Sequence, residues 1–110
     1  MKNQTFAIIN QFEVPKSSES DFLEFFSTHI KLIDSQPGSI DCRLFKANDD
    51  GDVLSYISVV RWQNQEAAKK AGLKIDAASR EAGVDVTEFQ KKHNIKVINR
   101  RFSEIPILSE

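Results

Sequence analysis

The chain has 110 residues, with 15 Lys and Arg against 16 Asp and Glu, so its formal net charge is -1. This length predicts a single domain over residues 1–110. A nearly neutral chain has no overall positive charge to attract nucleic acid or an anionic membrane surface, so we expect neither as a partner. No apolar run approaches the roughly 20 residues of a membrane span, no export signal is evident, and Cys42 is the only cysteine. We therefore expect a protein of the reducing cytoplasm.

The chain begins with patterns typical of a strand and then a helix. Apolar residues alternate from 6 to 14, which predicts a half-buried strand. Ser18 followed by Asp21 has the spacing of a capping box, and a wide apolar stripe follows it. Pro37 and Gly38 end this helix, because proline disfavours helix in the residue before it and glycine accepts a positive φ.

A β-hairpin is expected next. Residues 39–46 place Ile40, Cys42 and Leu44 on one face, and residues 53–62 are apolar on both faces. The turn-forming sequence NDDG at 48–51 joins the two segments. The two segments are therefore predicted to be antiparallel strands.

The last third of the chain predicts helices and one more strand. We expect a helix from Asn64 to Gly72, further helix at 76–82 that stops at Gly83, a short helix from Asp85 to His93, and a strand at 95–102. The resulting order, β-α-β-β-α-β with extra helix before the last strand, indicates an α+β ferredoxin-like split βαβ sandwich with an antiparallel four-stranded sheet.

Both faces of this sheet carry apolar residues. Helices cover only one face in such a fold, and Val53, Ile57 and Val59 lie on the other. We therefore expect a homodimer formed through the sheet faces, with the apolar tail 103–110 docking on the partner subunit.

Three segments carry a family resemblance: IINQFEVP at 8–15, PGS at 37–39 and SVVRWQNQEA at 58–67. Together they resemble the antibiotic biosynthesis monooxygenase (ABM) family of small dimeric α/β-barrel proteins, over residues 6–72. The resemblance implies a pocket between sheet and helices. In some relatives this pocket oxidises quinol-type polycyclic aromatics with O2, without metal or flavin. Other relatives bind and degrade heme, and many have no known reaction.

The residues expected of the heme-degrading relatives are incomplete. Asn10 matches their strand-one Asn, but Trp62 matches the Trp that is widespread in the family, and no His precedes His93 in the region after the third strand. Many other relatives carry a His late in the second helix, where this chain has Ala71 or nearby residues. We therefore expect no heme and no other cofactor, and a proton-transfer role cannot be carried over from that position.

His29 is the candidate catalytic residue. It lies beside the apolar stripe of the first helix, where a pKa near 6.5 suits a general base. The alternative is a boundary histidine bonded to backbone or water. Asn10 lies among apolar residues of the first strand, either as a substrate-binding amide or as a structural one, because a buried amide must find partners.

Four aromatic residues are candidate substrate contacts. Phe22 and Phe26 lie on the apolar stripe of the first helix, and Tyr56 and Trp62 share a face of the third strand. The alternatives are a sheet tyrosine with a satisfied hydroxyl and a core tryptophan. Two isolated histidines and one cysteine give no metal-ligand pair at helical or loop spacing, so no metal site is expected.

Two functions remain open from the sequence. One is a cofactor-independent monooxygenase acting on a small aromatic or quinol-type molecule. The other is a non-catalytic dimeric module that binds a small apolar or aromatic ligand or serves assembly.

Overall fold

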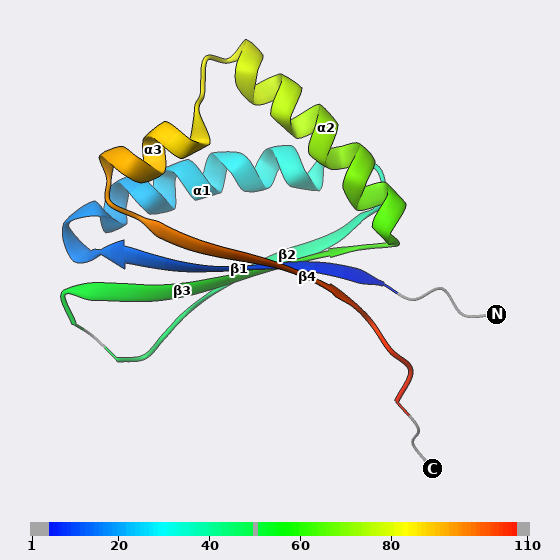
Figure 1. Ribbon diagram of the computed structural model, residues 1–110, viewed down its shortest axis with the longest axis horizontal. Coiled ribbons are helices and arrows are strands. Elements are labelled where there is room, and N and C mark those ends of the chain that lie inside the picture. Colours follow the sequence, from blue (N-terminus) through cyan, green and yellow to red (C-terminus); the bar gives the residue numbers. More distant parts are fainter. Residues whose placement is uncertain (1–4, 50, 108–110) are drawn as a thin grey trace.

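The computed structural model describes residues 5–49 and 51–107. Its elements are β1 (Phe6–Pro15), a 3-10 turn η1 (Lys16–Ser18), α1 (Glu19–Asp34), β2 (Ser39–Lys46), β3 (Val53–Trp62), α2 (Gln65–Glu81), α3 (Val86–Lys92) and β4 (Lys96–Ser103). The strands form one antiparallel sheet in the order β2-β3-β1-β4, and the helices lie on one side of it (Figure 1). This confirms the predicted α+β ferredoxin-like fold.

The core fills the space between α1 and the sheet. One cluster of buried residues contains Phe12, Val14, Phe22, Phe26, Leu54, Tyr56 and Ile95, and a second contains Phe6, Ile33, Val60, Trp62, Ala68 and Ala71. The Phe12 ring lies 5.0 Å from that of Phe22 and 5.9 Å from that of Phe26, in tilted and edge-on arrangements that aromatic pairs favour. These contacts fix α1 across β1.

The start of α1 differs from the predicted capping box. Ser18 precedes the helix, but its side chain makes no capping hydrogen bond. Instead its Oγ donates to the backbone oxygen of His93 at 3.1 Å. The single hydroxyl proton is therefore used to tie η1 to the end of α3.

The second helix is longer than predicted. Asn64 caps it as expected, since its side-chain oxygen accepts from the Ala67 amide at 2.8 Å. The helix then continues through Gly72 to Glu81, so the predicted end at Gly72 is wrong. An interior glycine costs a helix only about 1 kcal/mol relative to alanine, which the surrounding helix formers offset. The real stop is Gly83, whose φ is +72°.

The turn after α1 requires glycine. Gly38 has a φ of +87°, and a Cβ built there would lie 2.5 Å from the Cβ of Ala67 in α2. The predicted helix end is confirmed, and this glycine lets the turn approach the first turn of α2.

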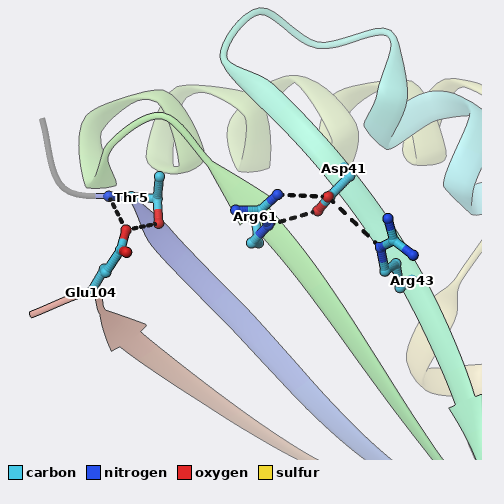
Figure 2. A network of polar contacts seen from close by, with 5 residues as sticks. All are labelled: Thr5, Asp41, Arg43, Arg61 and Glu104. Atoms are coloured by element: carbon cyan, nitrogen blue, oxygen red, sulfur yellow. Dashed lines mark hydrogen bonds and ion pairs between the residues drawn. The ribbon is translucent and has the colours of Figure 1, made fainter. Parts of the chain in front are cut away.

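The sheet surface opposite the helices, called the open face, mixes apolar and charged residues. Its exposed apolar side chains include Phe45, Val53, Ile57, Ile98 and Phe102. Near one end of the sheet, Arg61 donates two hydrogen bonds to the Asp41 carboxylate, at 3.0 and 2.8 Å, and Arg43 lies 3.8 Å from it (Figure 2). The bonds from Arg61 hold the pKa of Asp41 below its usual value.

Thr5, just before β1, and Glu104, just after β4, meet beside this network. The carboxylate of Glu104 accepts hydrogen bonds from the backbone and hydroxyl of Thr5, and the Glu104 amide donates to the Thr5 carbonyl at 2.9 Å (Figure 2). Ile105 and Ile107 are 72% and 85% exposed. Residues 108–110 lie outside the described residues, and docking of the tail on a partner stays a prediction. Among the described helices, none is long and apolar enough to cross a membrane.

Candidate active site between α1 and the sheet

A cavity of about 420 Å³ lies between the helices and the sheet. The sheet contributes Asn10, Ser58 and Asn99 to its lining, and α1 contributes Phe22, Phe26 and His29. Its volume lies within the roughly 300–1,000 Å³ typical of small-molecule sites. We call it the inner cavity. Four of the six residues predicted for the site line it: Asn10, Phe22, Phe26 and His29.

His29 is half-buried on α1 with its ring nearly parallel to that of Phe25, 6.0 Å between centroids. Burial lowers its pKa below the ordinary histidine value of 6.5, and the negative charge of Asp76 on α2 opposes this only in part. The imidazole is therefore neutral near pH 7. A neutral imidazole at a cavity wall can accept a proton from a bound ligand.

His29 also faces a second, wider space. A trough of about 1000 Å³ lies between α1 and the segment that runs from the end of α2 into α3. His29, Phe25 and Phe89 line both spaces, and the Phe25 and Phe89 rings stack at 4.2 Å. The histidine thus lies at the boundary between the inner cavity and the trough.

A row of three polar side chains crosses the sheet side of the inner cavity. Strand register places Asn10 of β1 directly between Ser58 of β3 and Asn99 of β4. The Asn99 amide nitrogen donates to Asn10 Oδ1 at 2.5 Å. Ser58 is 1% exposed, and its Oγ is buried with no hydrogen-bond partner among the described residues.

Tyr56 does not line the inner cavity. It is 4% exposed, and its hydroxyl donates to Glu19, whose carboxylate also accepts from Lys46 at 2.7 Å. Burial raises its pKa strongly, so it stays a phenol. Its position fits the alternative raised from the sequence, a sheet aromatic with a satisfied hydroxyl.

Trp62 also lies away from the inner cavity. It is 3% exposed and packs in the second core cluster with Phe6 and Ile33. Its indole nitrogen is buried without a partner among the described residues. The structure therefore places it in the core.

His93 and Cys42 do not line the inner cavity. His93 follows α3, where its Nδ1 is 3.6 Å from the Asp21 carboxylate and its ring is 4.4 Å from Phe89. Cys42 packs against both core clusters, and burial raises the pKa of its thiol to about 11. Over residues 5–49 and 51–107, no group of three His, Cys, Asp or Glu side chains is close enough to hold a metal ion.

Sequence reasoning missed Ser58 and Asn99. Ser58 lies between Tyr56 and Val60 on the inward-facing side of β3. A polar residue in this otherwise apolar series could have identified Ser58 as a candidate site residue. Asn99 could be identified only from the β1–β4 register, which the sequence did not give.

Solved structures with the same fold come from several organisms. A proposed monooxygenase from Shewanella loihica PV-4 matches with a TM-score of 0.71 at 20% identity, covering 97% of this chain and 100% of that one. SnoaB, a cofactor-independent oxygenase from Streptomyces nogalater, matches with a TM-score of 0.66 at 19% identity, covering 97% and 99%. A dimeric ferredoxin-like protein from an uncultured marine organism matches with a TM-score of 0.68 at 11% identity, covering 96% and 99%.

No curated protein sequence gives a significant match to the chain. The family model described as antibiotic biosynthesis monooxygenase matches residues 5–71, more than half of the chain. This span contains β1, α1, the hairpin and the start of α2, including Asn10, His29 and Ser58. The chain therefore belongs to the antibiotic biosynthesis monooxygenase family.

Proposed function

We propose that the protein is a cofactor-independent monooxygenase that oxidises a small aromatic or quinol-type molecule in the inner cavity, with His29 as general base. The observation that carries this proposal is the placement of a neutral, half-buried His29 and the Asn10 amide on one cavity with the rings of Phe22 and Phe26. Aromatic walls suit a flat ligand. Family membership and SnoaB, named as a cofactor-independent oxygenase, support the reaction class.

The proposed reaction needs only the substrate and O2. His29 takes the proton of a phenolic hydroxyl, and the phenolate transfers an electron to O2. Recombination of the two radicals forms a C–O bond at a ring carbon, and the peroxide is protonated by the histidine. Loss of water, which takes the hydrogen of that carbon and breaks the O–O bond, leaves a quinone carbonyl. The substrate loses four electrons, one oxygen atom enters the product and the other leaves as water.

Tyr56 and Trp62, the two predicted site residues that do not line the inner cavity, pack with residues that do. The Tyr56 ring lies 4.9 Å from that of Phe22, so Tyr56 supports one cavity wall. Trp62 packs in the same cluster as Ile33, another lining residue. We assign both a positioning role.

Oxygen uptake with dihydroxynaphthalenes tests the reaction. Removing a general base costs about 10²- to 10⁴-fold in rate, so we expect that loss in His29→Ala with the melting temperature nearly unchanged. His93→Ala is the matched control, because His93 lines the trough but not the inner cavity. Uptake that His29→Ala leaves unchanged would rule out the base.

The open face supports a homodimer within this proposal. The apolar residues of the open face are uncovered in one subunit, and a structural neighbour is named as dimeric. Two open faces packed together would form the dimeric α/β barrel expected from the sequence, in the cytoplasm.

A second candidate function is a non-catalytic dimeric module that binds a small apolar molecule or serves assembly. Ala71 favours it, because this buried position of α2 carries no proton-transfer group. Absence of oxygen uptake with every quinol tested, together with saturable ligand binding, would favour this module.

A further inference from the structure

Ser58 is one of the three polar side chains on the sheet side of the inner cavity, and its hydroxyl has no evident structural role. An oxygen buried without a hydrogen-bond partner destabilises the folded protein. The Ser58 hydroxyl is such a group among the described residues, and Ser58 is one of the residues that line a cavity large enough for a ligand. A ligand oxygen is the partner that would remove this cost.

The orientation of Asn10 follows from its neighbours. Arg101 Nη1 donates to Asn99 Oδ1 at 3.0 Å, and because a guanidinium can only donate, Asn99 must present its oxygen to Arg101. Its amide nitrogen is then left to face Asn10, where it donates to Oδ1. The amide nitrogen of Asn10 is thereby turned away from Asn99, and it donates to no other group in the part of the chain that the structure describes.

Asn10 and Ser58 are directly opposed across β1 and β3. Side chains at such positions have Cβ atoms about 4.5–5.5 Å apart on the same face. One acceptor oxygen placed between them is within reach of both the amide N–H and the hydroxyl.

We infer that Ser58 and Asn10 form a two-donor subsite for one carbonyl, phenolate or enolate oxygen of the ligand, and that Asn99 and Arg101 are positioning residues that set its donor character. This rests on the proposed function for the use of the inner cavity. The site selects ligands by their acceptor oxygen, whereas the aromatic walls select for flatness.

Two bicyclic probes test the donor character without any reaction. Chromone offers a carbonyl acceptor, and indole offers only an N–H donor. We expect the wild type to bind chromone more tightly than indole, measured by calorimetry or by NMR titration. Ser58→Ala should weaken chromone binding by about 2- to 10-fold, the equivalent of one hydrogen bond, and leave indole binding unchanged.

Asn99→Asp should reverse the direction of the hydrogen bond between residue 99 and Asn10. A carboxylate still pairs with Arg101 but can only accept, so Asn10 must turn its nitrogen toward residue 99 and its oxygen toward the cavity. We expect the ratio of chromone to indole affinity to fall by about 10-fold or more, with indole becoming the preferred probe.

Two controls separate orientation from charge. Gln90→Glu adds the same charge to the same cavity from α3, and Asn64→Asp adds it at the cap of α2, outside that cavity. Neither should reverse the preference. A reversal in Gln90→Glu as large as in Asn99→Asp, or an unchanged ratio in Asn99→Asp, would overturn the assignment.

The melting temperature gives a second readout. Because Ser58→Ala removes an unpartnered hydroxyl, the melting temperature should stay the same or rise. A fall of several degrees would mean that the hydroxyl is bonded within the protein, which would overturn the subsite.

The proposed reaction and this subsite can fail separately. A chromone preference lost in Ser58→Ala, without oxygen uptake from any quinol, would support the subsite and remove the reaction. Uptake without a chromone preference would support the reaction and overturn the subsite.

Discussion

The two faces of the sheet are built from alternate residues of the same four strands, and they contrast at neighbouring positions. Leu54, on the covered face, is 1% exposed, whereas Val53 beside it is 57% exposed on the open face. On the covered face the unusual residues are polar: Asn10 and Ser58 lie within an apolar layer. On the open face the unusual residues are apolar. The polar exceptions support the proposed ligand site, and the apolar exceptions support the proposed protein interface.

The largest expected effect concerns the covered face. Phe22 is 3% exposed, and its ring contacts those of Phe12, Phe26 and Tyr56. Phe22→Ala should lower the free energy of unfolding by about 3 to 5 kcal/mol, because a large buried ring is replaced by a void. Urea unfolding followed by circular dichroism measures this loss.

Phe45→Ala is the matched change on the open face, where Phe45 is 53% exposed. Its cost should be small at low protein concentration and should grow with concentration, because association stabilises the folded chain by mass action. The cost of Phe22→Ala should not depend on concentration. Equal costs for both variants at every concentration would contradict the difference between the two faces.

The next effect concerns association. Ile57 lies on β3 in the open face and is 37% exposed. We expect sedimentation to give about twice 12.5 kDa for the wild type. Ile57→Lys should reduce the mass to that of one chain, because an unpaired charge would be buried in the interface.

Ser27→Lys controls for the added charge, because Ser27 is exposed on α1, on the helical side of the molecule. It should leave the dimer intact. A wild-type protein that sediments as a single chain at micromolar concentration would remove the interface and leave the open face unexplained.

The sequence predicted the strands well because successive side chains of a strand point to opposite faces of a sheet. Val53 and Leu54 were therefore assigned to opposite faces before any contact was known, although both are apolar. The helix ends were harder to predict. Gly72 was interpreted as the end of the helix. The helix continues past it because Ala68 and Ala71 of α2 are buried and because the residues around Gly72 are good helix formers.

The site was predicted only in part. His29 and Asn10 were recognisable because each is polar within an apolar pattern. Their convergence on one cavity depends on how α1 crosses β1, which the helix pattern does not specify. Asn99 depends on pairing between strands 89 residues apart in the chain, as its bond to Asn10 shows.

The smallest predicted effect is the pH dependence of stability that His29 contributes. Its pKa in the folded protein is below the ordinary histidine value of 6.5, because burial disfavours the imidazolium. Above pH 6.5 the imidazole is neutral in both states, and its contribution to stability is complete. As the pH falls below 6.5, the unfolded chain binds a proton that the folded chain resists. The free energy of unfolding therefore falls, by at most about 1.4 kcal/mol per pH unit for one proton.

His29→Gln should flatten this part of the curve, because glutamine does not titrate. Urea unfolding at pH 7.5 and 5.5, for wild type and variant, isolates the contribution of His29, because the two proteins differ only at this residue. A wild type whose stability rises on acidification relative to the variant would show that the charge of Asp76 outweighs burial. His29 would then be protonated near neutral pH and unable to act as a base, so this small difference in stability also tests the chemistry proposed for the covered face.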